Sequence, residues 1–281
     1  MNELNNDIVS KIAKRAGQNI RREEGDYEKD GLLYCGKCNT PKQCKVPFGD
    51  TYIKPPCLCK CATEERDAKE TADKEFKRQQ RILILRTQGI KDERLFSCTF
   101  DNDKQPDSKY SLFVKRYCEQ WEKVLKENIG LILYGDTGRG KSFYAAAIAN
   151  AIVDKGIPVL FRTESDILDE LFDTTNKSGY IDKIASTPLL IIDDFGTRRD
   201  TAYATEQIKK IIDKRYYSEK PTIFTTNLTP DVFDKPKNID EKRIYERVKA
   251  MGQFIEIKGK NWRQDEAGQK AASLMELLKE E

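Results

Sequence analysis

Eight consecutive residues near the middle of the chain have the spacing of a phosphate-binding loop. Residues 135–142 read Gly-Asp-Thr-Gly-Arg-Gly-Lys-Ser, an apolar run precedes them, and a helix-prone run, 143–153, follows. A strand that leads into a glycine turn and then a helix directs backbone N–H groups and the positive helix end at one point. Lys141 could then reach the β- and γ-phosphates of a nucleotide, and the Ser142 hydroxyl could ligate Mg²⁺. The nucleotide-binding residues are therefore expected to be Gly135, Asp136, Thr137, Gly138, Arg139, Gly140, Lys141, Ser142 and Phe143.

Polar residues also follow two later apolar runs. The run 189–192 is followed by Asp193 and Asp194, and the run 222–226 is followed by Asn227. In an open parallel sheet, ligands bind at the carboxyl ends of the strands. We therefore expect Asp193 to coordinate Mg²⁺, Asp194 to activate the attacking water and Asn227 to sense the γ-phosphate. The alternative for each is an ordinary polar turn.

Three arginines near the C-terminus could also contact phosphate. Arg243 and Arg247 lie four residues apart and share one helical face, and Arg263 follows the last apolar run. An arginine from a neighbouring subunit can stabilise charge on a transferring phosphoryl group. From spacing alone, however, a solvated basic face is the favoured interpretation of Arg243 and Arg247, and by composition Arg263 lies in an ordinary basic loop.

Six of the eight cysteines lie between residues 31 and 61. Cys-x-x-Cys at 35–38 and Cys-x-Cys-x-Cys at 57–61 are typical of tetrahedral thiolate coordination of Zn²⁺. We expect the ligands to be Cys35, Cys38, Cys57 and Cys59, with Cys61 as the alternate to Cys59 and Cys44 as the spare thiol. Buried thiols or an Fe–S cluster are the alternatives, although the segment has few apolar residues for a core of its own. Cys98 and Cys118 stand apart and are expected to be packing residues.

The composition limits the remaining possibilities. The chain has 281 residues, no histidine and a net charge of only +3, so any nucleic-acid contact must come from local patches. Without histidine, acid–base work falls to carboxylates or lysines. No apolar stretch approaches about 20 residues and no signal sequence is recognisable, so we expect a cytoplasmic protein without a membrane partner. In that compartment thiols favour metal binding or burial over disulfides.

The elements that must position these residues alternate between strand and helix. Apolar strand-like runs occur at 130–134, 159–162, 189–193, 222–226 and 254–257, and helical segments at 109–128, 141–155, 164–174, 202–217 and 239–251. Such alternation predicts an α/β fold, a parallel sheet with helices on both faces. The expected organisation is an N-terminal helix or tail (1–30), a small zinc-binding domain (31–62), a charged helical linker (63–89), an ATPase domain (90–265) and a C-terminal tail (266–281).

Together, these motifs resemble the AAA+ ATPases of bacterial and phage replicative helicase loaders, the DnaC/DnaI type. The resemblance covers roughly residues 80–265 and includes the loop 135–142, the acidic strand 189–194, the helix 211–216, the strand end 225–228, the helix 243–248 and the loop 259–263. It implies a P-loop NTPase whose five-stranded parallel sheet has the order 5-1-4-3-2. It also implies ATP and Mg²⁺ as cofactors, with sites at the interfaces of a ring or spiral homo-oligomer that is hexameric when active.

The resemblance also implies roles for particular residues and partners. Arg247 is the first candidate for a trans-acting arginine finger, Arg243 the second, and Arg263 resembles a sensor-2 arginine. The implied function is the ATP-controlled loading of a hexameric, DnaB-like replicative DNA helicase, contacted through the N-terminal zinc segment. Many AAA+ proteins have Asp-Glu where this chain has Asp193-Asp194, so we expect slow hydrolysis, suited to a switch.

Single-stranded DNA is a further partner implied by the resemblance. Basic side chains interleaved with aromatic ones are typical of such binding. The candidates are Arg139, Phe143, Tyr144, Phe161 and Arg162, the helix 209–217, and the basic loop Thr197-Arg198-Arg199. Two other functions stay open. One is the ATPase helper subunit of a transposition system, and the other is an adaptor with a zinc module on an inactive ATPase fold.

Overall fold

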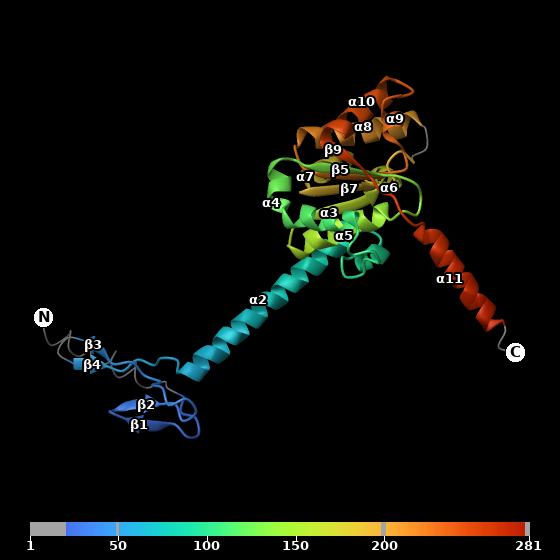
Figure 1. Cartoon of the computed structure of the whole chain (residues 1–281). Coiled ribbons are helices and arrows are strands. Elements are labelled where there is room, and N and C mark those ends of the chain that lie inside the picture. Colours follow the sequence, from blue (N-terminus) through green and yellow to red (C-terminus); the bar gives the residue numbers. More distant parts are fainter. Residues whose placement is uncertain (1–20, 49–50, 198–200, 279–281) are drawn as a thin grey trace, which may run out of the picture. The chain divides into compact units, whose positions relative to one another are not determined.

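The computed structural model describes residues 21–48, 51–197 and 201–278, which form two units. The first unit runs to Arg78 and the second starts at Gln79 (Figure 1). The expected N-terminal helix lies largely outside the described residues. Of the segment 1–30, residues 21–30 are described, and they include the strand Tyr27–Lys29.

The N-terminal unit is built on two short antiparallel hairpins. Strands β1 (Tyr27–Lys29) and β2 (Leu32–Tyr34) pair in the first hairpin, and β3 (Val46–Phe48) and β4 (Thr51–Ile53) pair in the second. The turn between β1 and β2 is Asp30-Gly31, and both residues have positive φ. Asp-Gly is a preferred pair for such two-residue hairpins, because both positions need the left-handed region.

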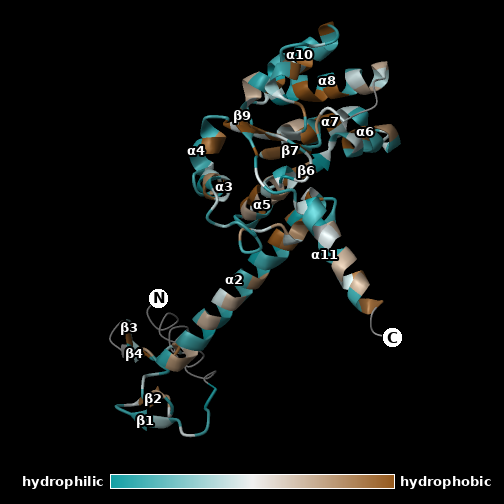
Figure 2. Ribbon diagram, turned by 45° about the vertical axis from the view of Figure 1, so that its right-hand side comes forward, coloured by the Kyte–Doolittle hydropathy of each residue, from teal (hydrophilic) through white to brown (hydrophobic). Residues whose placement is uncertain are grey.

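Helix α2 (Lys60–Gly89) begins three residues before the predicted charged helix and ends where it was predicted to end. It lacks Gly and Pro until its last residue, and it is largely hydrophilic along its length (Figure 2). Near its end, Ile82 and Leu85 pack into the core of the second unit. Gly89 is required there, because a Cβ atom would lie 2.2 Å from the Val159 carbonyl oxygen.

The second unit contains the predicted five-stranded parallel sheet. Its strands are β5 (Gly130–Tyr134), β6 (Val159–Thr163), β7 (Leu189–Asp193), β8 (Thr222–Thr226) and β9 (Gly252–Glu256). The spatial order is β6-β7-β8-β5-β9, with every pairing parallel. Numbered within the sheet, this is the order 5-1-4-3-2 that the resemblance implied.

Helices cover both faces of this sheet (Figure 1). The face formed by Leu131, Leu133 and Ile191 packs against α3 (Lys109–Glu119), α4 (Trp121–Lys126) and α5 (Lys141–Asp154). The face formed by Ile132 and Leu190 packs against α6 (Glu164–Asp173), α7 (Lys177–Ser186), α8 (Ala202–Tyr217) and α10 (Ile239–Met251). Because strand side chains alternate between faces, continuous apolar runs are what a sheet buried on both sides needs.

Some elements differ from the sequence prediction. The predicted helix 109–128 is divided at Gln120 into α3 and α4. The helices η1 (Glu93–Ser97), α7 and α9 (Pro230–Phe233) were not predicted. Residues from Trp262 to Leu277 form one helix, α11, so Arg263 lies in a first helical turn and not in a loop. In the part of the chain that is described, no helix is both long and apolar enough to span a bilayer.

Candidate nucleotide site and metal centre

The predicted phosphate loop joins β5 to α5 and has the backbone that such a loop needs. Gly138 and Gly140 have φ values of 81° and 94°, and Gly140 is the N-cap of α5. Gly138 also lies against the segment that follows β9, since a Cβ atom there would lie 2.1 Å from Asn261 Oδ1, which would have to move. The loop therefore presents its N–H groups at the positive end of a 14-residue buried helix.

Lys141 lies at the centre of this loop. Its Nζ donates hydrogen bonds of 2.8 Å to the carbonyl oxygens of Gly135 and Asp136 and to Asn227 Oδ1. Only 5% of the residue is exposed. Burial lowers the pKa of the ammonium, while the charges of Asp194 and Asp193 oppose that effect. The ammonium thus joins the loop to the end of β8, close to both acids.

Asp193 ends β7 and faces Ser142. Its Oδ1 accepts a hydrogen bond from the Thr225 hydroxyl, and the Ser142 hydroxyl also hydrogen-bonds the carboxylate. Burial raises the pKa of Asp193, whereas both hydrogen bonds and the charge of Lys141 lower it. A hydroxyl and a carboxylate that touch, beside a phosphate loop, are the oxygen donors that Mg²⁺ prefers, so the predicted pair fits this ion.

A cavity of about 360 Å³ opens in front of these groups. The predicted residues that line it are Thr137, Gly138, Gly140, Lys141, Ser142, Phe143, Asp194, Asn227 and Arg263, and Thr197 and Trp262 complete it. The side chains of Asp136 and Arg139 are not brought into this cavity. Arg139 instead donates to the Gly259 carbonyl oxygen and pairs with Asp136, which fastens the loop to the segment after β9.

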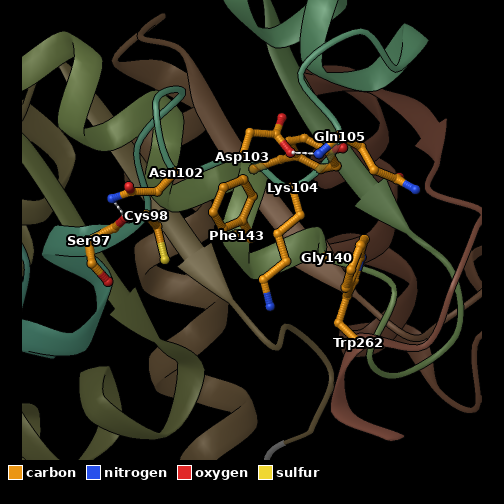
Figure 3. A pocket seen from close by; sticks show the side chains of 10 residues that line it. Ser97, Cys98, Asn102, Asp103, Lys104, Gln105, Gly140, Phe143 and Trp262 are labelled. Atoms are coloured by element: carbon orange, nitrogen blue, oxygen red, sulfur yellow. Dashed lines mark hydrogen bonds between the residues drawn. The ribbon is translucent and has the colours of Figure 1, made fainter. Parts of the chain in front are cut away.

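A second cavity of about 360 Å³ adjoins the first (Figure 3). The two share Gly140, Phe143 and Trp262, and the rest of the second wall comes from the segment 97–105 and Tyr144. Lys104 Nζ lies 5.3 Å from the centre of the Trp262 ring. The wall of this cavity combines three aromatic residues, Phe143, Tyr144 and Trp262, with polar side chains of the segment 97–105, a combination that could hold a flat aromatic base. Cys98 lines this cavity and packs against the core, and Cys118 is buried. Both were predicted to be packing residues.

The two arginines of α10 differ in their surroundings. Arg247 pairs with Asp213 of α8, and its guanidinium lies 5.9 Å and 5.5 Å from the ring centres of Tyr216 and Tyr217. Arg243 is exposed. Neither is among the residues that line the two cavities of its own chain.

Four thiols of the N-terminal unit face one another. The Sγ atoms of Cys35, Cys38, Cys59 and Cys61 all lie within 4.8 Å of one another. Cys61 Sγ is 3.6 Å from Cys35 Sγ and 3.4 Å from Cys59 Sγ. Tetrahedral thiolates at a Zn–S distance of about 2.3 Å have sulfurs about 3.8 Å apart, so the cluster has the size of a zinc site.

The hydrogen bonds of the cluster favour thiolates at its first two positions. Hydrogen bonds from the backbone of Cys38 and Lys37 lower the pKa of the Cys35 thiol. Hydrogen bonds led by that of the Thr40 hydroxyl lower the pKa of Cys38 to about 5. Contacts with the other thiols, Cys59 first, raise the pKa of Cys61 to about 12. A divalent cation would relieve this crowding of negative charge, which is the electrostatic condition for a thiolate metal centre.

This geometry corrects the predicted ligand set, because Cys57 stands outside the cluster. Its Sγ is 3.6 Å from the Pro41 carbonyl oxygen, and burial together with the Cys44 thiol raises its pKa to about 11. The backbone N–H of Cys57 donates to the Lys42 carbonyl oxygen in an extended pairing. The chain then turns into α2 at Lys60, and this turn brings both Cys59 and Cys61 to the Cys35–Cys38 knuckle.

Most aromatic and basic candidates for DNA contact have other roles. Tyr144 and Phe161 are buried in the core. Arg162 is buried as well and pairs with Glu170. Tyr216 and Tyr217 at the end of α8 are exposed. Arg198 and Arg199 lie outside the described residues.

Sequence reasoning missed several residues of the site. Trp262 lines both cavities, and Thr225 holds the acidic turn through its hydroxyl. In the N-terminal unit, Asp26 accepts hydrogen bonds from Gly36 N, within the Cys35–Cys38 knuckle, and from Lys42 Nζ. Trp262 could have been found from its place beside Arg263, whereas single polar residues such as Asp26 carry no spacing signal.

Comparison with known proteins gives a consistent result. Residues 67–270 match the family described as IstB-like ATP binding protein. The chain is 30% identical to the replicative helicase loader DnaC of Escherichia coli strain K12 over 138 residues, 47% of this chain and 56% of that protein. It is 27% identical to the replicative helicase loader DnaI of Bacillus subtilis strain 168 over 147 residues, 48% and 47% respectively. The chain thus spans about half the length of these relatives.

Two solved structures share the fold. The crystal structure of the DnaC helicase loader is 25% identical, covers 59% of this chain and all of that chain, and has a TM-score of 0.50. The crystal structure of DnaI is 22% identical, covers 62% of this chain and 94% of that chain, and has a TM-score of 0.51. At this identity the second likeness concerns the fold alone.

Proposed function

Because this chain belongs to the family of IstB-like ATP binding proteins, we propose that it is an AAA+ ATPase that loads a hexameric replicative DNA helicase onto single-stranded DNA in the cytoplasm. The observation that carries the proposal is the convergence of separate segments on one cavity. The phosphate loop, Asp194 after β7, Asn227 after β8 and Arg263 of α11 all line it. The relatives named as replicative helicase loaders support the choice of partner.

Several residues in or beside the cavity have a proposed task in ATP chemistry. Lys141 and Arg263 place positive charge beside the phosphates, and Ser142 and Asp193 would hold Mg²⁺. When bound, Mg²⁺ neutralises charge that develops on the phosphate oxygens. Asp194 accepts a proton from the attacking water, and Asn227 contacts the γ-phosphate. Phe143 and Trp262 border the adjoining cavity, which would hold the adenine base.

Hydrolysis is proposed to be slow. Asp194 is one methylene shorter than the glutamate that many AAA+ proteins carry, so its carboxylate stands further from the water it must polarise. Slow turnover suits a switch whose ATP-bound form is long-lived. A turnover number like that of fast motor ATPases, measured on the full chain with Mg²⁺, would refute this part of the proposal.

The ATP sites are proposed to lie between subunits of a ring or spiral. Arg247, with Arg243 as the second candidate, would then reach the nucleotide of the neighbouring subunit. Both arginines come from α10, outside the cavities of their own chain. Single-stranded DNA would bind to the assembled oligomer, and exposed Tyr216 and Tyr217 beside basic residues offer one surface for it.

The N-terminal unit is proposed to be the zinc-dependent contact with the helicase. The test is capture of the replicative helicase of the host by the tagged full chain, before and after zinc chelation. We expect capture before chelation and its loss afterwards, while nucleotide binding by the ATPase unit persists. Failure to capture the helicase under both conditions would contradict the loader function.

Capture by the tagged full chain also distinguishes helicase loading from two other functions. Copurification with a transposase in place of the helicase would favour the ATPase helper of a transposition system, which shares this core. The cysteine cluster and the named loader relatives favour the loader. An adaptor that does not depend on nucleotide would keep helicase capture in Lys141→Ala and would show no ATP turnover in the wild type.

A further inference from the structure

Glu164 is a buried carboxylate beside the acidic turn, and the predicted mechanism leaves it without a role. It follows the last residue of β6, and Thr163 of that strand pairs with Asp193 of β7. Glu164 is completely buried. The cap of α6 is supplied by other residues, because Thr163 and Asp166 form a complete capping box. A buried carboxylate is costly unless its hydrogen bonds compensate it, so its partner is informative.

One partner of Glu164 belongs to the turn that carries Asp194. Glu164 Oε2 accepts a 2.6 Å hydrogen bond from the backbone N–H of Gly196. Asp194 and Gly196 both have positive φ, 53° and 87°, so the turn uses the left-handed region, which glycine enters freely and aspartate more readily than most other residues. At 2.6 Å, this bond is short for an N–H···O hydrogen bond.

Two other backbone N–H groups of this turn donate hydrogen bonds to Thr225 of β8. Thr225 accepts from the N–H of Asp194 through its hydroxyl (3.0 Å) and from the N–H of Phe195 through its carbonyl oxygen (2.8 Å). Three successive N–H groups are therefore fixed from two sides, by β8 and by Glu164. The side chain of Asp194 emerges from this turn into the phosphate cavity.

We propose that Glu164 is a positioning residue for ATP hydrolysis, which holds the 194–197 turn so that Asp194 faces the attacking water. This inference rests on the proposed ATPase function. Glu164 would affect the rate of ATP hydrolysis through Asp194, whereas nucleotide binding would depend on the phosphate loop.

The test uses the full chain and compares Glu164→Ala and Glu164→Gln with the matched control Glu170→Gln. Glu170 also lies on α6 but contacts Arg162 and Tyr180. We expect Glu164→Ala to lower the single-turnover hydrolysis rate at least tenfold, with the ATP dissociation constant within threefold of wild type. Glu164→Gln keeps an oxygen that can accept the hydrogen bond, so its hydrolysis rate should fall less than that of Glu164→Ala. The glutamine variant therefore still tests the inference if the alanine variant does not fold. Glu170→Gln should keep the wild-type rate.

A double-mutant cycle separates positioning from general structure. In an Asp194→Ala background, Glu164→Ala should cause no further loss of rate, because its effect passes through Asp194. The inference would be overturned if Glu164→Ala lowered the hydrolysis rate by the same factor in the wild-type and Asp194→Ala backgrounds. A fall in ATP affinity and melting temperature that parallels the fall in rate would also overturn it. So would wild-type turnover in Glu164→Ala. If the wild type binds ATP but does not hydrolyse it, the ATPase proposal fails, and this inference fails with it.

Discussion

The Lys141 ammonium donates a 2.8 Å hydrogen bond to Asn227 Oδ1, so the phosphate loop and the end of β8 meet at one charged group. These residues are 86 positions apart in the chain. The strands that precede them in the chain, β5 and β8, are paired neighbours in the sheet. A γ-phosphate that engages the lysine would therefore be within reach of the amide as well.

This relationship predicts different effects for the two residues. Lys141→Ala should weaken ATP binding at least tenfold, because it removes the main positive charge of the cavity. Asn227→Ala should leave ATP affinity within about threefold and lower turnover roughly tenfold, as expected for a group that acts on the transition state. Calorimetric titration and a single-turnover assay measure the two quantities, with Lys155→Ala at the far end of α5 as the control. Equal losses of affinity in both variants would contradict this division of roles.

Zinc content should follow the structural cluster and not the predicted ligand set. Cys61→Ser should lose zinc, because it removes one of four converging thiolates. Cys57→Ser should keep one zinc per chain, since Cys57 lies outside the cluster. Metal analysis of the purified full-length variants measures this. Zinc retained in Cys61→Ser and lost in Cys57→Ser would restore the sequence-based choice.

Trp262 should report on the nucleotide base. It borders both cavities, whereas the other tryptophan, Trp121, is buried in the core. ATP should therefore change the intrinsic fluorescence of the wild type, and most of that change should vanish in Trp262→Phe. Trp121→Phe is the matched control and should keep the response. Inorganic triphosphate, which has no base, should give a smaller signal than ATP.

Mixing inactive variants tests whether Arg247 acts on a neighbouring subunit. Lys141→Ala has a defective site and an intact arginine, and Arg247→Ala has the reverse. If the arginine acts in trans, the mixture should recover part of the wild-type turnover while each variant alone stays at least tenfold lower. Arg243→Ala in place of Arg247→Ala tests the second candidate. No recovery with either arginine variant would speak against a finger on α10.

Arg215 should matter for stability. It is fully buried, and its guanidinium donates to the Thr222 hydroxyl and to carbonyl oxygens of residues 185, 187, 188 and 221. Burial lowers its pKa to about 9. Arg215→Met would remove the guanidinium from several buried or partly buried acceptors and should lower the free energy of unfolding by roughly 3 kcal/mol or more. Denaturant titration measures the loss, and exposed Lys214→Met should change stability by less than about 0.5 kcal/mol.

The amino-acid sequence was enough to predict the five strands of the parallel sheet and a nucleotide-binding motif. Apolar runs buried on both faces have a recognisable composition, and the phosphate loop and acidic strand act through local spacing. The resemblance to helicase loaders also supplied the sheet order that the structure has. Helix α7 was missed because its sequence has a weak periodicity and contains Gly179.

Contacts between residues from distant segments became apparent only in the folded chain. Cys61 replaced Cys57 because the chain turns into α2 between Cys59 and Cys61, and thiol spacing does not encode that turn. Likewise, Glu164 approaches Gly196 because β6 and β7 are neighbours, and α11 brings Trp262 to the phosphate loop. Spacing in sequence fixes contacts within a turn or a helix. Contacts across the sheet depend on strand order and on close packing, which no local pattern records.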